Sequence, residues 1–258
     1  MTWWQAIFLS LLQGLTEFLP VSSSGHLVIF QKIFGLQPPV LFDVFVHVGT
    51  LGSVIFFFRK ELLKILQGLL KKDKNAWHIF WLVVVGSLPA VVVGLFLEKN
   101  INQIFNSIRL VGISFLITSV LLISTRWFKK KNNKRFKSIN WHDALIIGFF
   151  QALAILPGVS RSGSTLVGGL SRKIKREIAF QFSFFLALPA ISGALVLQIP
   201  DLINQQFDFL SKSIFGLLIA GLVGYFSLKI LKNFLLNSRL WFFGFYCFFL
   251  ALLIFFFS

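Results

Sequence analysis

The chain has 258 residues, of which 56% are hydrophobic and only 13% are charged. Soluble domains carry about 25% charged residues, so this composition excludes an ordinary soluble protein and predicts an integral membrane protein surrounded by lipids. The net charge of +16 does not indicate a nucleic-acid partner, because the lysines and arginines gather in short runs between apolar segments instead of lining a soluble fold.

Six segments are predicted to be transmembrane helices, since a helix needs about 20 mostly apolar residues to cross a bilayer. Short basic loops between such helices face the cytoplasm, and 20 of the 25 lysines and arginines lie in four clusters, at 59–74, 126–137, 172–176 and 229–239. We therefore expect the C-terminus, the loop with Glu98 and Lys99, and the loop 200–211 outside. The predicted spans are 41–58, 77–97, 107–125, 177–199, 212–230 and 240–257.

Two further segments, 1–35 and 141–172, are interrupted by proline and glycine and do not form complete spans. Segment 141–172 has basic clusters on both sides, so it is expected to enter and leave at the cytoplasmic face. Segment 1–35 precedes a span that starts outside, so it is expected to enter from the outer face. We predict both to be re-entrant helical hairpins, which are tolerated only where they are buried in protein or line a polar cavity.

The hairpins indicate an internal repeat, although chance similarity between apolar segments is the alternative. An offset of 138 residues aligns QGLTEFLPVSSSGH (13–26) with QALAILPGVSRSGS (151–164). The single membrane domain then has two halves, 1–125 and 141–258, each with one hairpin and three spans. Because three is an odd number of crossings, the second half is inverted relative to the first. Inverted repeats with broken helices place a binding site near the bilayer midplane. The identical pairs are Gln13/Gln151, Leu15/Leu153, Val21/Val159, Ser22/Ser160, Ser24/Ser162 and Gly25/Gly163.

The two breaks predict an anion site. The first helix of each hairpin should end near Pro20 or Pro157, because proline blocks an interior helical hydrogen bond. The serines that follow are good N-caps, and the free N–H groups of a new helix attract anions. Arg161 in the second break adds a permanent charge whose fork suits phosphate.

The other polar residues of the first break leave several roles open. Glu17 is either the structural partner of Arg161, a metal ligand or a general base. Any one of the serines 22–24 is either a helix cap or a nucleophile. His26, one turn after Ser23, is either structural or an acid/base group, and the neighbouring anion site favours the second role.

Polar residues outside the breaks give weaker signals. Asp43 and His47, one turn apart, either line the entrance to the site or face water. His78 and His142 lie beside tryptophans at span ends, which favours interface anchoring. Cys247, alone in a Phe-rich span, is either packed inside or faces lipid.

The motifs resemble those of a known family. GLTEFLPVSSSGH, preceded by Gln13, resembles the (E/Q)xxxE motif and serine-histidine segment of bacterial undecaprenyl-diphosphate phosphatases, the bacitracin-resistance type. PGVSRSGST (157–165) resembles the second signature of that family, PGxSRSGxT. The resemblance implies an enzyme of the bacterial plasma membrane with its site open to the outer face. Its reaction would hydrolyse undecaprenyl diphosphate to the monophosphate carrier of peptidoglycan synthesis.

The resemblance also implies roles for individual residues. Ser23 would be the nucleophile, His26 its acid/base partner, Arg161 the diphosphate clamp, and Glu17 with Gln13 the acidic motif. Many members have a carboxylate where Gln13 stands, so two-carboxylate metal binding is in doubt and Gln13 is expected to position its neighbours. The expected substrate-binding residues are Gln13, Ser22, Ser24, Ser160, Ser162 and Thr165.

The sequence leaves open the cofactor, the phosphoryl acceptor, a transport function and the oligomeric state. The cofactor would be Mg²⁺ or Ca²⁺, bound either by Glu17 or by the diphosphate. Phosphoryl transfer would go either to Ser23 or directly to water. A transporter of lipid phosphates or anions would use the same architecture and the same midplane site. The sequence is compatible with a homodimer.

Overall fold

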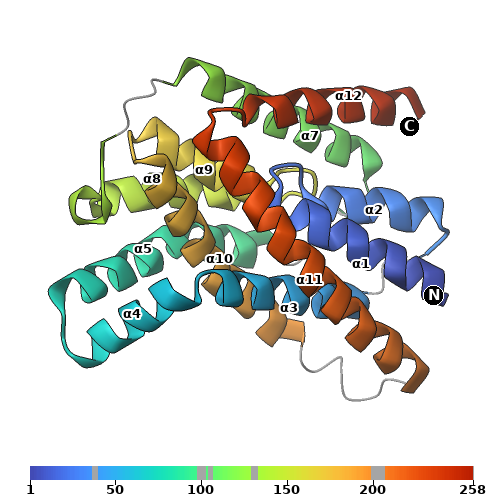
Figure 1. Cartoon of the computed structure of the whole chain (residues 1–258). Helices are drawn as coiled ribbons and strands as arrows, with labels where there is room; N and C mark the ends of the chain where they lie inside the picture. The colour runs from blue at the N-terminus through green and yellow to red at the C-terminus, as the bar shows by residue number, and fades with distance from the viewer. Residues whose placement is uncertain (37–39, 98–102, 104–106, 129–132, 199–206, 258) are drawn as a thin grey trace.

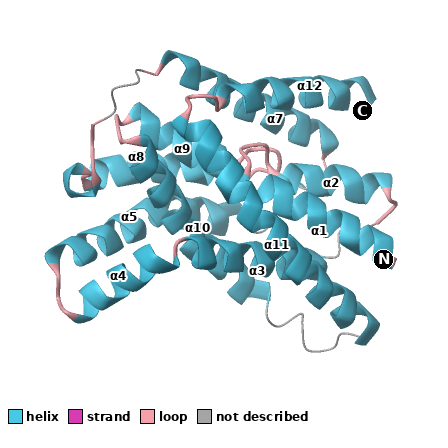
Figure 2. Ribbon diagram, viewed as in Figure 1, coloured by secondary structure: helices cyan, strands magenta, loops and turns pink. Residues whose placement is uncertain are grey.

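The computed structural model describes residues 1–36, 40–97, 103, 107–128, 133–198 and 207–257. This part of the chain is helical and contains no strand (Figures 1 and 2). The loop with Glu98 and Lys99 lies outside the described residues, as do the first seven residues of the loop 200–211. The helices are α1 (Trp3–Phe18), α2 (Ser23–Ile33), α3 (Val40–Phe57), α4 (Arg59–Leu70), α5 (Lys74–Leu97), α7 (Ile108–Ser124), α8 (Trp141–Leu153), α9 (Arg161–Ser171), α10 (Arg176–Gln198), α11 (Phe207–Leu236) and α12 (Trp241–Phe257).

Several of these helices confirm a multi-pass membrane protein. Among the described residues, three helical stretches are long and apolar enough to cross a membrane, and they correspond to the predicted spans 77–97, 107–125 and 212–230. Helices α3 and α4, bent by 75°, would make a fourth span if they are taken together. The predicted spans 177–199 and 240–257 coincide with α10 and with the shorter apolar helix α12.

The hairpin helices pack in a reciprocal way. Helix α1 packs along α11, and its counterpart α8 packs along α5, while α7 and α12 lie side by side (Figure 1). Glycines allow these close approaches. A Cβ on Gly14 would lie 2.8 Å from the Cβ of Val223 on α11, and a Cβ on Gly148 would collide with the backbone of Gly86 on α5. The first helix of each hairpin is therefore held by a helix from the other half of the chain.

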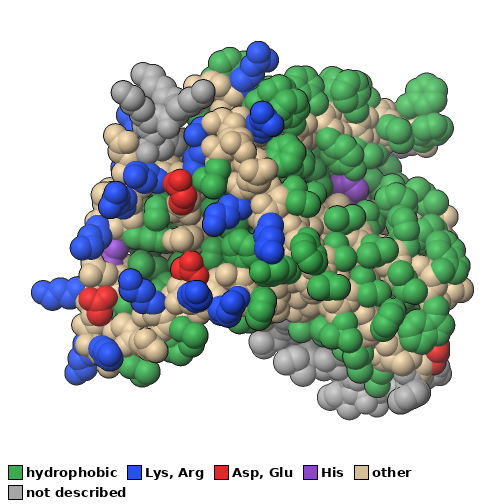
Figure 3. Space-filling model, in the orientation of Figure 1, with side chains coloured by type: hydrophobic (Ala, Val, Ile, Leu, Met, Phe, Trp, Pro, Cys, Tyr) green, Lys and Arg blue, Asp and Glu red, His purple; other side chains and the backbone are tan. Residues whose placement is uncertain are grey.

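The charges divide the molecule into two sides. Lysines and arginines gather on the side where α4 and α8 lie, and hydrophobic side chains cover most of the rest of the same view (Figure 3). Both ends of the chain lie on the opposite side (Figure 1). This separation agrees with basic loops on one face of a bilayer and both termini on the other.

A buried aspartate joins the basic loops to the second hairpin. Asp143, whose side chain is fully buried, accepts hydrogen bonds from Lys134 Nζ at 2.8 Å and from Arg172 Nε at 2.8 Å. Burial would raise the pKa of Asp143, but the hydrogen bonds from these two cations outweigh burial and hold the pKa below its usual value. The resulting stabilisation is present above the ordinary aspartate pKa and is lost as the pH falls through the lowered one.

We expect Asp143→Asn to destabilise the protein, because it leaves two cations without their shared carboxylate. A cost of about 1–3 kcal/mol would lower the melting temperature by on the order of 5 °C. Thermal unfolding of the purified protein in detergent measures this change. Glu61→Gln on α4 is the matched control, because none of the described ion pairs involves Glu61. Equal melting temperatures for the two variants would contradict a structural role for the Asp143 cluster.

Candidate active site

The first break separates α1 from α2. Helix α1 ends at Phe18, two residues before Pro20, and α2 begins at Ser23, as predicted. Ser22 is the N-cap of α2, and its Oγ accepts a hydrogen bond from Gly25 N at 3.4 Å. The backbone of Ser22 has φ +65°, a left-handed conformation that a residue with a side chain rarely adopts. The chain therefore makes a tight turn immediately before Ser23.

The second break has the same plan. Helix α8 ends at Leu153, and α9 begins at Arg161 with Ser160 as its N-cap. Ser160 Oγ accepts a hydrogen bond from Gly163 N at 3.1 Å. Gly158 has φ +101°, which glycine adopts without steric cost. Both breaks thus end in a serine-capped helix N-terminus, the arrangement that binds anions.

The two breaks cross in the interior of the molecule, where the blue and yellow loops of Figure 1 meet. Gly158 N donates to Ser22 Oγ at 3.1 Å. A Cβ on Gly25 would lie 2.8 Å from Gly158 Cα, and one on Gly163 would lie 3.2 Å from Pro20 Cβ. The two glycines that the sequence repeat aligns therefore face opposite breaks, and their lack of a side chain permits the crossing.

Helices α7 and α12 support the crossing from the side. Thr118 on α7 donates its hydroxyl to the carbonyl of Gly158 at 2.8 Å and accepts from Ser160 N at 3.0 Å. Cys247 on α12 is fully buried, and its Sγ lies 3.9 Å from the carbonyl oxygen of Pro20. Cys247 is thus packed against the first break. Each break is braced by one of two paired helices.

Glu17 is the centre of the polar cluster at the crossing. Arg161 from the second break donates to Glu17 Oε1. Ser23 Oγ donates to Glu17 Oε2 at 2.5 Å, and Gln13 Nε2 donates to the same oxygen at 3.0 Å. The side chains of Glu17 and Arg161 are only 6% and 15% exposed, so their attraction is weakly screened by solvent. The structure thus brings together residues from both breaks.

His47 joins this cluster from α3. Its Nε2 lies 3.7 Å from Glu17 Oε2, and its Nδ1 donates to the Asp43 carbonyl at 2.6 Å. Gln31 holds the Asp43 carboxylate at 2.9 Å. Of the two alternatives left open by the sequence, the structure therefore places His47 beside the site.

Other predicted site residues point elsewhere. His26 Nδ1 lies 2.7 Å from the Ser22 carbonyl, and its Nε2 lies 2.6 Å from the hydroxyl of Tyr246 on α12, so its ring is directed to α12 instead of to Ser23. Thr165 Oγ1 lies 2.5 Å from Ser183 Oγ and bonds the Arg161 carbonyl. The remaining serines lie at the breaks: Ser24 Oγ is 3.3 Å from Ser22 Oγ, and Ser162 Oγ is 3.2 Å from Ser160 Oγ.

The oxygens of the cluster can be compared with those that a divalent cation binds. The described residues contain no group of three or more His, Cys, Asp or Glu side chains that could hold a metal by itself. Gln13 Oε1, however, is buried without a hydrogen-bond partner next to the Glu17 carboxylate. Mg²⁺ and Ca²⁺ accept amide and carboxylate oxygens as ligands. Gln13 Oε1 and the Glu17 carboxylate are therefore oxygens of the type that such an ion takes as ligands.

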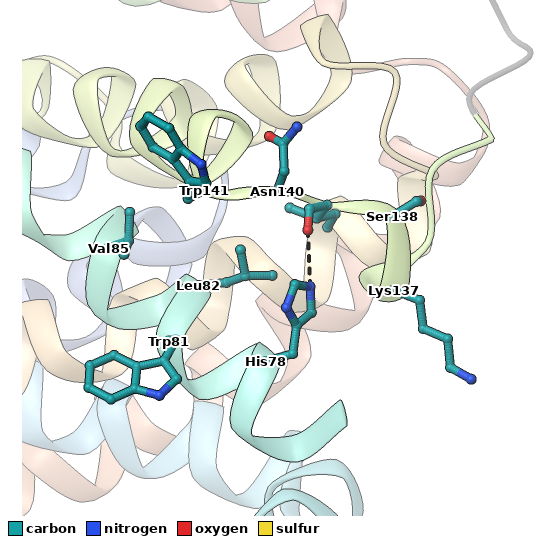
Figure 4. Close-up of a pocket in the computed structure, with 9 residues that line it drawn as sticks. His78, Trp81, Leu82, Val85, Lys137, Ser138, Asn140 and Trp141 are labelled. Carbon is teal, nitrogen blue, oxygen red and sulfur yellow. Dashed lines mark hydrogen bonds between the residues drawn. The ribbon is translucent and has the colours of Figure 1, made fainter. Parts of the chain in front are cut away.

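A separate cavity of about 400 Å³ lies between α5 and the segment 137–141 (Figure 4). His78 Nε2 closes one wall by donating to the Ile139 carbonyl at 3.0 Å, so His78 links α5 to this loop. Trp81 and Trp141 flank the cavity. It contains none of the polar residues of the crossing and is therefore not the candidate active site.

Three contributors to the site were not predicted from the sequence. The sequence indicates no role for Thr118 and Tyr246, and it leaves two roles open for His47. Each is a polar group inside an apolar helix, and its partner lies on a distant segment of the chain. The polar residue is visible in the sequence, but the distant partner is not.

The chain is similar to known proteins over almost its full length. Residues 6–253 match the family described as bacitracin resistance protein BacA. The undecaprenyl-diphosphatase of Methanococcus maripaludis is 41% identical over 244 residues, covering 95% of this chain and 96% of that protein. Those of Thermosipho melanesiensis and Carboxydothermus hydrogenoformans are 39% and 40% identical, covering 95% and 97% of this chain and 96% and 95% of those proteins.

We expect Gly25→Ala to disturb the crossing, because the added methyl group would lie 2.7 Å from the Phe115 ring and 2.8 Å from Gly158 Cα. Such overpacking costs about 1–3 kcal/mol. Gly52→Ala on α3 is the matched control, because its Cβ would meet nothing within 4 Å. Thermal unfolding in detergent should show a lower melting temperature for the Gly25 variant only. Equal stability of the two variants would mean that the breaks do not touch.

Proposed function

The chain belongs to the bacitracin resistance protein BacA family, and we propose that the crossing of its two helix breaks is where it hydrolyses undecaprenyl diphosphate to undecaprenyl phosphate and phosphate. The substrate is inferred from the name of the relatives, undecaprenyl-diphosphatase. The enzyme is a membrane-embedded phosphoric anhydride hydrolase. Its product is the monophosphate carrier that peptidoglycan synthesis uses again.

The hydrogen bond from Ser23 to Glu17 is the observation that carries this proposal. A hydroxyl 2.5 Å from a carboxylate has its proton acceptor already in place. A transporter of anions would use the helix N-termini and Arg161, but it would have no need for an activated hydroxyl at the same point. The geometry therefore favours an enzyme over a carrier.

The diphosphate is bound by groups from both breaks. The N-termini of α2 and α9 present free N–H groups and the positive ends of their helix dipoles. Arg161 uses one nitrogen for Glu17 and keeps further N–H groups for a phosphate oxygen. These donors stabilise the charge that develops on the transferred phosphoryl group. The prenyl tail lies in the bilayer.

The first chemical step is a phosphoryl transfer to serine. As Ser23 Oγ forms its bond to the terminal phosphorus, its proton moves to Glu17 Oε2. The bond from that phosphorus to the bridging oxygen breaks, and undecaprenyl phosphate leaves with the bond's electron pair. In the second step, water attacks the phosphorus of the phosphoserine, and the bond from that phosphorus to Ser23 Oγ breaks. Glu17 returns its proton to Ser23 Oγ, and the protons of the water leave with the inorganic phosphate.

A divalent cation would be held by Gln13 Oε1 and Glu17 together with diphosphate oxygens, as the unpartnered amide oxygen suggests. When bound, Mg²⁺ or Ca²⁺ would neutralise charge on the two phosphates. Gln13 also orients Glu17 through its amide N–H.

The membrane arrangement that we propose has six spans and two re-entrant hairpins in an inverted repeat. The reciprocal packing of α1 on α11 and of α8 on α5 supports the inverted relation of the halves. The hairpin α1–α2 begins on the side of the chain ends, opposite the lysines and arginines (Figures 1 and 3). The site would thus open to the outer face of the plasma membrane.

Phosphate release by the purified protein tests this function. The protein in detergent receives a C55 polyprenyl diphosphate, with or without Mg²⁺ or Ca²⁺, and heat-denatured protein is the control. Inorganic phosphate and the monophosphate should appear in equal amounts. The proposed function is wrong if folded protein releases no phosphate under any of these conditions.

We expect Arg161→Lys to lower kcat/KM at least ~10-fold, because a point charge replaces a planar fork that binds Glu17 and phosphate together. Steady-state phosphate release measures the effect. Arg109→Lys in the exposed first turn of α7 is the matched control and should be unaffected. Near-normal activity of the Arg161 variant would show that the guanidinium does not clamp the diphosphate.

We expect Ser23→Ala to lower kcat on the order of 100-fold or more, because the nucleophile is missing. Wild-type protein should yield a phosphoserine when the reaction is quenched with acid, and the variant should yield none. Ser87→Ala, which removes a hydroxyl bonded within α5, controls for loss of a serine in an apolar helix. Full activity of the Ser23 variant would instead support direct attack by water.

A further inference from the structure

We propose that Tyr246 and His26 form a positioning relay that holds Ser23 against Glu17, so that His26 acts through its Nδ1–H and not as an acid or base. This inference rests on the proposed function and concerns the same site. It assigns a role to a second side chain of α12, beside Cys247.

The hydrogen bonds of the His26 ring define its tautomer. Nδ1 lies 2.7 Å from the Ser22 carbonyl, which can only accept, so Nδ1 carries the proton. In the neutral ring Nε2 is then an acceptor, and the Tyr246 hydroxyl donates to it at 2.6 Å. Both nitrogens are thus occupied by partners other than Ser23 and Glu17.

Aromatic contacts hold the ring in this orientation. The imidazole lies parallel to the Tyr246 ring, with an interplanar angle of 5° and centroids 5.7 Å apart. Phe115 meets it edge-on, with centroids 5.3 Å apart. The His26 side chain is therefore fixed in the interior, where it is only 3% exposed.

Helix α12 is itself held in place at this level. Cys247, the residue after Tyr246, packs against the carbonyl of Pro20 in the first break. A Cβ on Gly244 would lie 2.7 Å from Ile123 Cγ1 and 3.0 Å from the carbonyl oxygen of Ser119, so α12 lies tightly against α7. Tyr246 thus approaches His26 from a rigid support.

The relay ends at a strained residue. Ser22 adopts φ +65°, a conformation that is sterically unfavourable for a residue with a side chain. The Nδ1–H of His26 holds the Ser22 carbonyl, and the hydroxyl of Ser22 accepts from Gly158 N. These bonds fix the turn from which Ser23 reaches Glu17. Without the Tyr246 hydroxyl, the imidazole keeps only its hydrogen bond to the Ser22 carbonyl and is free to tilt away from it.

Substitutions of His26 separate positioning from acid/base chemistry. An asparagine side chain places an N–H near the position of Nδ1, whereas a glutamine amide reaches the position of Nε2. We expect His26→Asn to keep kcat within ~5-fold of wild type and His26→Gln to lose at least ~10-fold more. If both variants lose activity equally, His26 is an acid/base group and the relay is wrong.

Tyrosine substitutions test the first member of the relay. Tyr246→Phe keeps the stacked ring and should lower kcat by about 3- to 10-fold, the effect of one hydrogen bond, with KM unchanged. Tyr225→Phe is the control, since Tyr225 on α11 is the other tyrosine of the chain and packs on Phe56 and Phe57. In a His26→Asn background, Tyr246→Phe should have no further effect. Additive losses, or equal activity of the two tyrosine variants, would overturn the relay.

A spectroscopic measurement keeps this inference separate from the proposed function. The chain has four histidines, and ¹⁵N NMR of histidine-labelled protein reports which ring nitrogen carries the proton. The signal missing from the His26→Asn variant identifies His26. It should show a protonated Nδ1 and a hydrogen-bonded Nε2 in wild type, and the Nε2 signal should move to that of an acceptor without a donor in Tyr246→Phe. An unchanged signal would refute the relay, whereas absent phosphate release by wild type would refute only the function.

Discussion

The buried ion pair between Glu17 and Arg161 is the interaction on which the rest of the structure depends. A charge inside a membrane protein is costly unless it is paired, and each of these residues lies at a break that belongs to a different half of the chain. The pair therefore forms only if the breaks meet. They meet because Gly25 and Gly163 leave no side chain between them.

The surrounding helices hold the two helix breaks together. Helix α1 lies along α11 and α8 along α5, so each half supports the hairpin of the other. Helices α7 and α12 brace the breaks through Thr118 and Cys247. The polar groups freed by the breaks are satisfied by these contacts, which allows irregular backbone in an apolar interior.

Much of the fold and part of the site could be predicted from the sequence. The apolar segments and the Pro-Ser-Gly punctuation located both breaks and most of the helices, because these features act within one or two helical turns. Helix α4, however, lies where the sequence predicts a basic loop. The motifs identified Glu17, Ser23 and Arg161, which the structure brings together. The orientation of His26 and the contribution of Tyr246 could not be predicted, since 220 residues separate them and only the packing of α12 brings them into contact.

Contacts between residues far apart in the sequence also explain the other differences between the predicted and the observed site. His47 and Asp43 were recognised as a polar pair, but only the placement of α3 decides which side chain meets Glu17. Thr165 belongs to a signature motif, yet its hydroxyl is directed to Ser183 on α10. Short-range patterns predict which residues are polar and buried, whereas the long-range packing decides which of them share a site.

The proposed function requires that the two breaks form a single binding site for a diphosphate. The most direct measurement is a structure of the protein with a non-hydrolysable methylene diphosphonate of a C55 prenol. The diphosphonate should lie between the N-termini of α2 and α9, with Arg161 on its oxygens and the terminal phosphorus within reach of Ser23 Oγ. A diphosphonate bound elsewhere, for example in the cavity between α5 and the segment 137–141, would contradict it.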